Sequence, residues 1–487
     1  MLNSINDSPL HRIANPRSIA FFGASNNFRS MGSSLLASVR SMGFTGPIYP
    51  VHPKEPRVQT LPAWRSVLDL PEAPDLAVVV LPTHLVAPTI EDCGRKGVRR
   101  AIVVTAGFNE VGGEGAARQK ELMEAAARHG VRLMGPNCLG VVNAHLPLNT
   151  TFYPFDGIPG FIGLASQSGS LITQLFRHLA DFGLGFSSAF SVGNEADLDV
   201  VDCLEYFGAC PETRVITLYI EGIRRGREFV EVARSITPRK PIVAFYIGGS
   251  ETGRRAGLSH TGAMAGPDRL YDGIFRQSGV LRAGSITELF DFAWALGVLP
   301  PPRGNRVVIQ TNSGGPGAAA ADACGRAGLE LPPLSDRTIE RLSAFIPGTG
   351  SVNNPVDITF TKNPRAFFHE IPQALLEDEN MDAMLLYVLM GGAGIKRAAE
   401  LSGVGAGEAQ AEAERIMDKQ SRALARWAAS QGKPVLGYTF RRPETPAIRN
   451  LVQGGLPVFP GPVRAVRALK ALRDYAIIRE RLAARPA

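Results

Sequence analysis

The sequence predicts an α/β protein of three domains, each built on a parallel β-sheet covered by helices. At 487 residues the chain suits about three domains, at roughly 150 residues each. Its 45% hydrophobic content, with 52 glycines and 36 prolines, fits compact domains with many tight turns. Short apolar runs alternate with helical patterns, and such runs are typical of strands buried on both faces of a parallel sheet.

The first block has the alternating pattern of a nucleotide-binding, Rossmann-like domain. A turn at Gly23-Ala24-Ser25 follows its first strand, and a helix is expected over 32–42. We predict its strands at residues 18–22, 47–51, 76–81, 101–105 and 132–134.

Its ligand-binding loop departs from the pattern of dinucleotide sites. The loop over 23–32 reads G-A-S-N-N-F-R-S-M-G, which is not G-x-G-x-x-G, and Lys54 rather than an acidic residue follows the second strand. A lysine there favours a phosphate-bearing ligand over NAD, which argues against an NAD-dependent dehydrogenase. An exposed, solvated Lys54 is an equally good interpretation.

The second block places candidate chemistry at the ends of its strands. Ser168-Gly169-Ser170 lies between a strand at 160–165 and a helix at 171–182, where free backbone N–H groups and the helix dipole favour an anion. A simple serine N-cap is the alternative. Glu221 follows the strand at 215–220, at the edge where open α/β sheets bind ligands.

His260 lies among small residues in the sequence S-H-T-G-A-M-A-G. The strand at 241–247 and the loop at 248–257 precede it, so we expect His260 at the same sheet edge as Glu221. The segment alone favours a reactive imidazole and a hydrogen-bonded turn histidine equally.

The third block runs from about residue 305 to 462, after the prolines at 300–302, and a basic helix follows it. Seven of the residues over 463–487 are Lys or Arg and two are acidic, which accounts for +5 of the net charge of +7. Apolar residues recur near helical spacing, and no aromatic residues alternate with the charges, so we favour a packing helix over a nucleic-acid arm. Predicted elements are strands at 306–311, 383–390, 434–440 and 456–459, a loop at 352–357 and a long helix at 406–430.

Composition argues against several other classes of protein. No apolar run approaches the ~18 residues of a membrane span, and the N-terminus lacks a signal-peptide pattern, so we expect a cytoplasmic protein. The five cysteines are scattered and odd in number, which indicates neither a disulfide framework nor a metal site.

An ordered set of motifs connects the chain to a known family. It resembles the nucleoside-diphosphate-forming acyl-CoA synthetases, in particular the α subunit of ADP-forming acetate–CoA ligase and, more distantly, that of succinyl-CoA synthetase. The motifs are F-G-A-S at 22–25, T-A-G-F at 105–108, G-P-N-C-L-G at 135–140, S-Q-S-G at 166–169, S-V-G-N at 191–194, Y-I-E-G at 219–222, S-H-T-G-A at 259–263 and N-P-V-D at 354–357.

The resemblance implies both a domain plan and a reaction. The domains would be a CoA-binding Rossmann-like domain (1–145), a flavodoxin-like domain with a phosphohistidine loop (155–298), a second flavodoxin-like domain (305–462) and the C-terminal helix (463–487). The reaction would be acid + CoA + ATP = acyl-CoA + ADP + phosphate, through an acyl phosphate and a phosphohistidine.

The resemblance also implies roles for particular residues. His260 would carry the phosphoryl group, Glu221 would orient the imidazole, and Ser168, Gly169 and Ser170 would hold the phosphoryl oxygens. Tyr246, Gly249 and Thr173 depart from the family near the presumed acyl site, so the acid need not be acetate or succinate. The residues placed along CoA are Gly23, Ala24, Ser25, Lys54, Thr105, Ala106 and Asn137.

The nucleotide site is expected on another chain. The sequence contains neither a G-x-x-x-x-G-K-[ST] motif nor an ATP-grasp domain, so the resemblance implies a separate ATP-grasp β subunit that binds Mg-ATP in a hetero-oligomer. The glycines of 248–256 would let the phosphohistidine loop move between subunits. The alternative is a non-catalytic, regulatory CoA-binding protein of the same fold.

Overall fold

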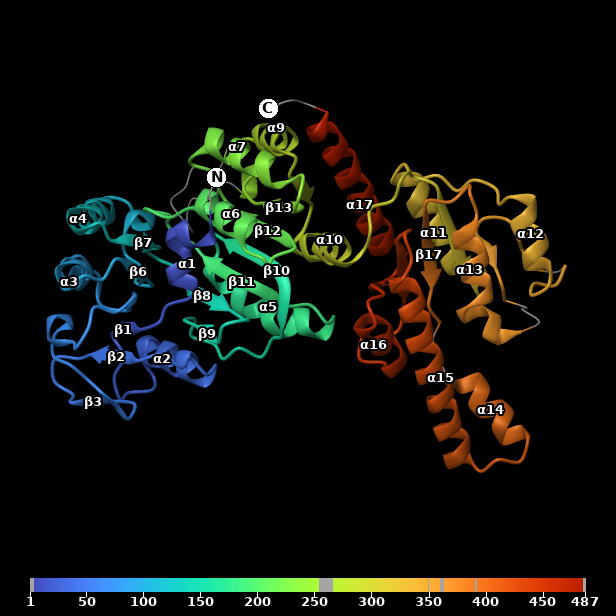
Figure 1. Cartoon of the computed structure of the whole chain (residues 1–487), viewed down its shortest axis with the longest axis horizontal. Helices are drawn as coiled ribbons and strands as arrows, with labels where there is room; N and C mark the ends of the chain where they lie inside the picture. The colour runs from blue at the N-terminus through green and yellow to red at the C-terminus, as the bar shows by residue number, and fades with distance from the viewer. Residues whose placement is uncertain (1–3, 254–265, 349, 360–362, 390–391, 485–487) are drawn as a thin grey trace. The chain divides into compact units, whose positions relative to one another are not determined.

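A computed structural model describes residues 4–253, 266–348, 350–359, 363–389 and 392–484 of the chain. It contains three larger β-sheets and a small hairpin, with helices between the strands (Figure 1). The predicted fold class is confirmed, because each large sheet is mainly parallel and alternates with helices along the sequence.

The first sheet is parallel throughout and has the strand order β2-β1-β5-β6-β7. All four residues of β5 are buried, as expected for a central strand covered on both faces. Its strands are β1 (Ile19–Phe22), β2 (Ile48–Val51), β5 (Leu76–Val79), β6 (Arg100–Val103) and β7 (Arg132–Met134), and the hairpin is formed by β3 (Arg57–Val58) and β4 (Leu61–Pro62). Its helices are α1 (Pro9–Ala14), α2 (Met31–Ser41), α3 (Thr83–Lys96) and α4 (Glu114–His129), of which α3 and α4 lie side by side (Figure 1).

The second sheet has seven strands in the order β14-β13-β12-β10-β11-β8-β9. The two strands at one edge are antiparallel to their neighbours, and residues 140–143, which the sequence assigned to the first domain, form one of them. The strands are β8 (Gly140–Asn143), β9 (Leu148–Asn149), β10 (Pro159–Ser166), β11 (Phe186–Ser191), β12 (Val215–Ile220), β13 (Ile242–Tyr246) and β14 (Leu281–Ala283). The helices are α5 (Gly169–Asp181), α6 (Val200–Ala209), α7 (Gly226–Ile236), α9 (Asp268–Ser278) and α10 (Ile286–Val298).

The third sheet is parallel and has the strand order β16-β15-β17-β18-β19. Two residues of the predicted loop at 352–357 form β16, because they pair with the end of β15. The strands are β15 (Val307–Thr311), β16 (Val356–Asp357), β17 (Ala383–Tyr387), β18 (Val435–Thr439) and β19 (Val458–Pro460). The helices are α11 (Gly314–Arg326), α12 (Asp336–Ser343), α13 (Glu370–Glu377), α14 (Ala393–Leu401), α15 (Ala406–Ala429), α16 (Pro446–Gln453) and α17 (Pro462–Ala483).

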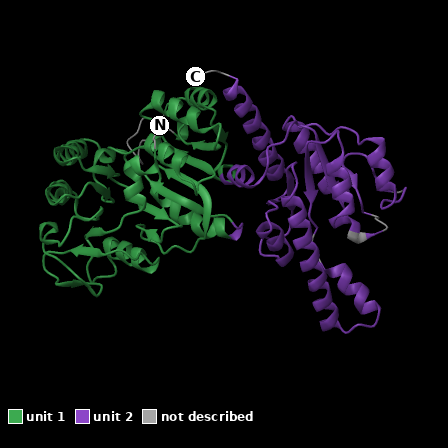
Figure 2. Cartoon of the chain, in the orientation of Figure 1, with its two compact units in different colours: residues 1–180, 184–289 green, residues 181–183, 290–487 purple. Residues whose placement is uncertain are grey.

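The chain forms two compact units (Figure 2). Residues 1–180 and 184–289 make up the first unit, which therefore contains both the first and the second sheet. One buried apolar cluster joins these two sheets, since it includes Ile19 and Val78 from the first and Leu218 and Ile220 from the second. Residues 181–183 and 290–487 make up the second unit.

Helix α17 packs as the sequence predicts for a terminal amphipathic helix. Leu469, Leu472, Tyr475 and Ala476 are buried on it, and it contacts α11, β18 and β19. Among the helices of the described ranges, none combines the length and the apolar composition that a membrane-spanning segment requires.

Candidate functional site

All the residues that the sequence places along CoA lie in loops at the carboxyl edge of the first sheet. Gly23, Ala24 and Ser25 follow β1, Lys54 follows β2, Thr105 and Ala106 follow β6, and Asn137 follows β7. Because the strands are parallel, these loops leave the same edge. The chain places β2 on one side of β1 and then crosses to β5 on the other side. Ligands of open α/β sheets bind at such a switch point in the strand order.

The loop after β1 makes a close approach that requires glycine. Gly23 has a φ of +91°, and a Cβ there would lie 2.0 Å from the carbonyl oxygen of Val80. The N–H of Ser25 donates to Ser33 Oγ (3.0 Å), and that hydroxyl donates to the carbonyl oxygen of Ser25 (2.8 Å). These bonds fix the loop against α2.

The loops after β6 and β7 are connected directly. The N–H of Asn137 donates to the carbonyl oxygen of Thr105 (2.9 Å), and Thr105 Oγ1 donates to that of Leu81 (2.7 Å). Thr83 Oγ1 donates to the carbonyl oxygen of Ala106 (2.9 Å). The loops after β1, β2, β6 and β7 thus line one edge of the sheet. Hydrogen bonds hold the backbone of the loops after β6 and β7 in place.

The Lys54 side chain is exposed at this edge. The backbone N–H of Lys54 donates to Nδ1 of His52 (3.3 Å). An exposed ammonium on a flexible stem can reach a phosphate group of a ligand bound at the edge. The same exposure fits the solvated alternative, so the role of Lys54 stays a prediction.

The predicted phosphate turn and Glu221 leave the same edge of the second sheet. Ser168, Gly169 and Ser170 join β10 to the start of α5, and Glu221 directly follows β12. The two strands are parallel neighbours with Ser166 opposite Tyr219, which brings the turn and the carboxylate to adjacent positions. Ser168 and Glu221 are both buried.

His260 lies outside the described residues. The last strand before it, β13, is parallel to β12 and ends with Tyr246 opposite Ile220. The chain therefore leaves the second sheet at the edge that carries Glu221, and the role of His260 stays a prediction.

Gln167 ties the phosphate turn to Glu221, although the sequence analysis gave it no role. Its Oε1 accepts hydrogen bonds from the N–H groups of Glu221 and Gly222, the latter at 3.0 Å. Its Nε2 donates to the carbonyl oxygen of Gly222 (2.8 Å) and to Oε2 of Glu195 (2.7 Å). The oxygen and the nitrogen of the Gln167 amide therefore both take part in holding the loop after β12.

Glu195 is the second residue that the sequence analysis missed. Its side chain is buried and Oε1 accepts from the N–H of Val200 (2.9 Å). Burial raises the pKa of Glu195 to about 8, and the nearby Asp199 adds to the effect, while Gln167 and Arg224 oppose it. Glu195 follows β11, a strand that we did not predict, and recognising that strand would have placed it at the sheet edge.

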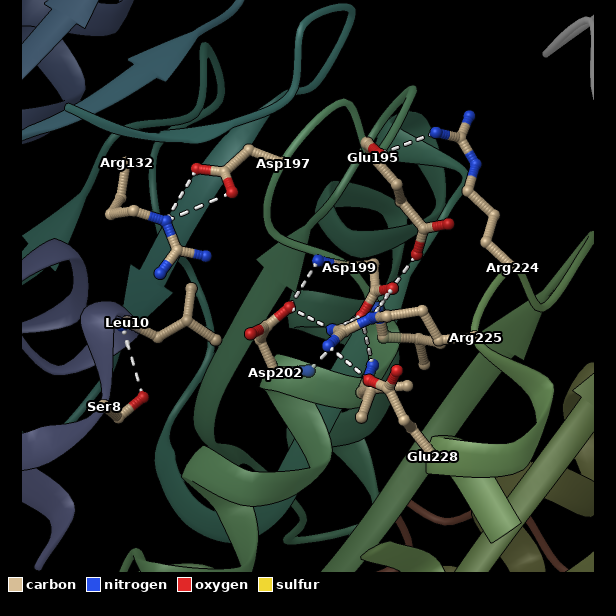
Figure 3. A network of polar contacts seen from close by, with 12 residues as sticks. Ser8, Leu10, Arg132, Glu195, Asp197, Asp199, Asp202, Arg224, Arg225 and Glu228 are labelled. Atoms are coloured by element: carbon tan, nitrogen blue, oxygen red, sulfur yellow. Dashed lines mark hydrogen bonds and ion pairs between the residues drawn. The ribbon is translucent and has the colours of Figure 1, made fainter. Parts of the chain in front are cut away.

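Two adjacent arginines hold the backbone and helix start around Glu195 (Figure 3). Arg224 donates to the carbonyl oxygens of Glu195 (2.8 Å) and Asn194 (2.7 Å). Arg225 pairs with Asp199, which caps the start of α6, and with Asp202 in the first turn of that helix. Both arginines follow Glu221 within four residues, so the loop after β12 holds the loop after β11.

The loop after β11 also contacts the edge of the first sheet. Asn137 Nδ2 donates to Asn194 Oδ1 (3.3 Å), and Asn194 Nδ2 donates to Glu110. Gly193 has a φ of +56°, and a Cβ there would lie 2.4 Å from the carbonyl oxygen of Pro136. This close approach joins the two candidate sites within one compact unit.

Glu110 completes the contact on the side of the first sheet. It accepts hydrogen bonds from the N–H groups of Gly107 and Phe108, which follow the predicted CoA residues Thr105 and Ala106. Burial acts to raise the pKa of Glu110, but the bonds from Asn194 and these backbone groups hold it below its ordinary value.

Family models match all three blocks of the chain. A CoA binding domain matches residues 17–144, a succinyl-CoA ligase-like flavodoxin domain matches 159–296, and a ligase-CoA domain matches 307–413. Together these matches show a CoA-binding domain followed by two CoA-ligase domains along the chain.

Individual relatives define the family more narrowly. The α subunit of ADP-forming acetate–CoA ligase II from Pyrococcus furiosus is 42% identical over 76% of this chain and 80% of its own length. The α subunit of ligase I from the same organism is 37% identical over 96% of this chain and 97% of its own. The chain belongs to the family of ADP-forming acetate–CoA ligase α subunits, which confirms the predicted resemblance and the acid–thiol ligase class.

A solved structure agrees with this assignment. The acetyl-coenzyme A synthetase 1 of Candidatus Korarchaeum cryptofilum, in complex with phosphate and ADP, superimposes with a TM-score of 0.84 at 34% identity, covering 98% of both chains.

Within the described part of this chain, no group of three or more His, Cys, Asp or Glu side chains could hold a metal ion.

Proposed function

We propose that the chain is the CoA-binding, phosphohistidine-carrying subunit of an ADP-forming acyl-CoA ligase, with the four domain ranges given above. The reaction is acid + CoA + ATP = acyl-CoA + ADP + phosphate. The residues along CoA are the seven that line the carboxyl edge of the first sheet, from Gly23 to Asn137.

The observation that carries the proposal is the continuous polar contact between the two sheet edges. Asn137 belongs to the CoA edge and bonds to Asn194, and the neighbouring Glu195 bonds to Gln167, which holds Glu221 beside the phosphate turn. A CoA thiol and an acyl phosphate must meet within one site for thioester formation, and the contact between the two edges supports binding segments that lie near each other.

The chemistry assigns a distinct task to each residue. Neutral His260 uses a ring-nitrogen lone pair to take up a phosphoryl group, and Glu221 accepts the other ring N–H, which fixes the tautomer and stabilises the cationic phospho-imidazole. The N–H groups and hydroxyls of Ser168, Gly169 and Ser170 hold the phosphoryl oxygens with little reorganisation.

The steps balance without an additional reactant. Phospho-His260 transfers its phosphoryl group to the carboxylate of the acid, and the acyl phosphate forms as the P–N bond breaks. The CoA thiolate then attacks the acyl carbon, the C–O bond to phosphate breaks, and acyl-CoA and phosphate leave. ATP restores phospho-His260 and leaves as ADP.

The nucleotide is proposed to bind to a partner chain. The family members named above are α subunits, which supports a second subunit. We assign Mg-ATP to an ATP-grasp β subunit that forms a hetero-oligomer with this chain. Copurification of the chain with an ATP-grasp protein expressed from a neighbouring gene, and ATP-dependent labelling only when both are present, is the expected result.

The proposal is tested by incubating the purified chain with ³²P-labelled acetyl phosphate. We expect an acid-labile, base-stable label on the wild type and none on His260→Ala. Equal labelling of both proteins would contradict the assignment of His260.

The same assay separates the ligase from the alternative of a regulatory CoA-binding protein. A regulator binds CoA but acquires no label with any acyl phosphate or with a partner and ATP. A panel of short, branched and aromatic acids, tested with the reconstituted pair, identifies the acid.

A further inference from the structure

Glu195 lies in a buried position that the proposed chemistry does not use. Both of its carboxylate oxygens accept hydrogen bonds, Oε2 from Gln167 Nε2 (2.7 Å) and Oε1 from the N–H of Val200 (2.9 Å). Only 5% of the residue is exposed. A carboxyl group so deeply buried is costly and is retained where its hydrogen bonds set a geometry.

The backbone of Glu195 is held as firmly as its side chain. Its φ is +50°, which is uncommon for a residue other than glycine, and Arg224 donates to its carbonyl oxygen. Arg224 lies three residues after Glu221, so the loop after β12 fixes the residue whose carboxyl group reaches back to that loop through Gln167.

We propose that Glu195, acting through Gln167, is a positioning residue of the phosphoryl-transfer site. Gln167 fixes the N–H groups of Glu221 and Gly222, and it precedes Ser168, so its orientation sets both the orienting carboxylate and the phosphate turn. This inference rests on the proposed function, because it assigns Glu195 to that same site.

The orientation of the Gln167 amide depends on an acceptor at residue 195. Nε2 donates to Glu195 and to the carbonyl oxygen of Gly222, which leaves Oε1 for the two backbone N–H groups. In Glu195→Gln, the new NH₂ group must face either Nε2 of Gln167 or the N–H of Val200, and both are donors, whereas both oxygens of a protonated carboxyl group can still accept a hydrogen bond. Either the bond to Gln167 is lost directly, or the bond from Val200 that anchors residue 195 beside Gln167 is lost, so in both cases Gln167 is held less firmly.

Burial favours the neutral form of Glu195 at pH 7, and the charged groups that face it modify this effect. Asp199 repels an ionised carboxylate, while Arg224 attracts it, and Asp199 itself is paired with Arg225. Cys203 and Tyr271 also lie within the electrostatic reach of Glu195. A neutral Glu195 adds no negative charge next to a turn that must bind an anionic phosphoryl group, whereas ionisation near pH 8 adds one.

The experiment compares wild type, Glu195→Gln, Gln167→Leu, the double variant and Glu231→Gln as full-length chains. Glu231 is exposed on α7 and serves as the matched control. The rate of labelling by ³²P-labelled acetyl phosphate is measured from pH 6 to pH 9, and CoA binding is measured by calorimetry to show that the fold and the CoA edge are intact.

We expect Glu195→Gln to label about tenfold or more slowly than wild type, with CoA affinity within about twofold. Gln167→Leu should show a similar loss, and the double variant should be no slower than the slower single variant, because both act through one contact. The wild-type rate should fall as the pH rises through about 8, and this fall should be absent from Glu195→Gln.

Failure of this inference is distinguishable from failure of the proposed function. If the wild type acquires no label, the function is contradicted. If the wild type is labelled, and Glu195→Gln has the rate and pH profile of wild type or the two variants have independent effects, the positioning role of Glu195 is overturned and the function stands.

Discussion

Glu195 makes protein stability depend on pH. Burial raises its pKa to about 8 in the folded protein, from an ordinary value near 4.5. Between these values the folded chain keeps a proton that the unfolded chain releases, so the contribution of Glu195 to the free energy of unfolding falls as the pH rises. Below both pKa values Glu195 is protonated in the folded and the unfolded chain, and above both values it is ionised in both.

Glu195→Gln cannot ionise and therefore lacks this dependence. We expect the free energy of unfolding of the variant, relative to wild type, to increase between about pH 4.5 and pH 8, by at most about 1.4 kcal/mol per pH unit. Urea unfolding across this range measures the difference, with Glu231→Gln as control. A difference that stays constant with pH would show that Glu195 titrates normally in the folded protein.

Lys54 provides the second prediction at the scale of single residues. If its ammonium pairs with a phosphate of CoA, Lys54→Ala should weaken CoA binding about 1.4- to fivefold, because an exposed ion pair contributes about 0.2–1 kcal/mol. The effect should grow at low ionic strength. Calorimetry with Lys120→Ala, an exposed lysine on α4, provides the comparison. Unchanged affinity for CoA at low salt would favour the solvated Lys54.

At the scale of elements, the sequence predicted the strands that are continuous apolar runs and missed those that depend on long-range pairing. β5 and β12 have four and five buried residues, respectively, and lie near their predicted bounds. β11 reads F-S-S-A-F-S, and all of its residues are buried, so its serines interrupt the apolar run by which a buried strand is recognised. β8 is antiparallel to β11, a pairing that no local pattern indicates.

The site shows the same limit. The motifs predicted Glu221 and the Ser168–Ser170 turn as site residues, because polar residues after apolar strands mark the edge of a parallel sheet, and the structure places both at that edge. Gln167 lies within the S-Q-S-G motif at 166–169, but its contact with residues 221 and 222 depends on the pairing of β10 with β12. The role of Glu195 required β11 to be recognised first.

Helix α17 provides a prediction about packing. Leu469 is 1% exposed and Ile477 is 45% exposed on the same helix. Leu469→Ala should lower the free energy of unfolding by about 2–5 kcal/mol, because it leaves a cavity in the second unit. Ile477→Ala should change it by about 0.5 kcal/mol or less. Equal effects in urea unfolding would argue that α17 does not pack as described.

At the scale of the whole molecule, chain length and the alternation of strands and helices predicted three blocks, and the contacts form two compact units. The first two sheets share one buried cluster, which includes Leu10 and Ile13 of α1 as well as residues of both sheets. Length and periodicity give the number of sheets, but they do not show which apolar faces meet. The shared core is also what keeps the CoA edge and the phosphate turn in one unit.

In the proposed function, this chain carries a phosphoryl group between a nucleotide and an acyl group. The most direct measurement is a single-turnover chase, in which the chain is phosphorylated, freed of nucleotide, and mixed with CoA and the acid in the absence of ATP. We expect one equivalent of acyl-CoA per phosphorylated chain, loss of the label from the peptide that contains His260, and no product from His260→Ala. A phosphorylated chain that keeps its label in the presence of CoA and every acid of the panel would contradict it.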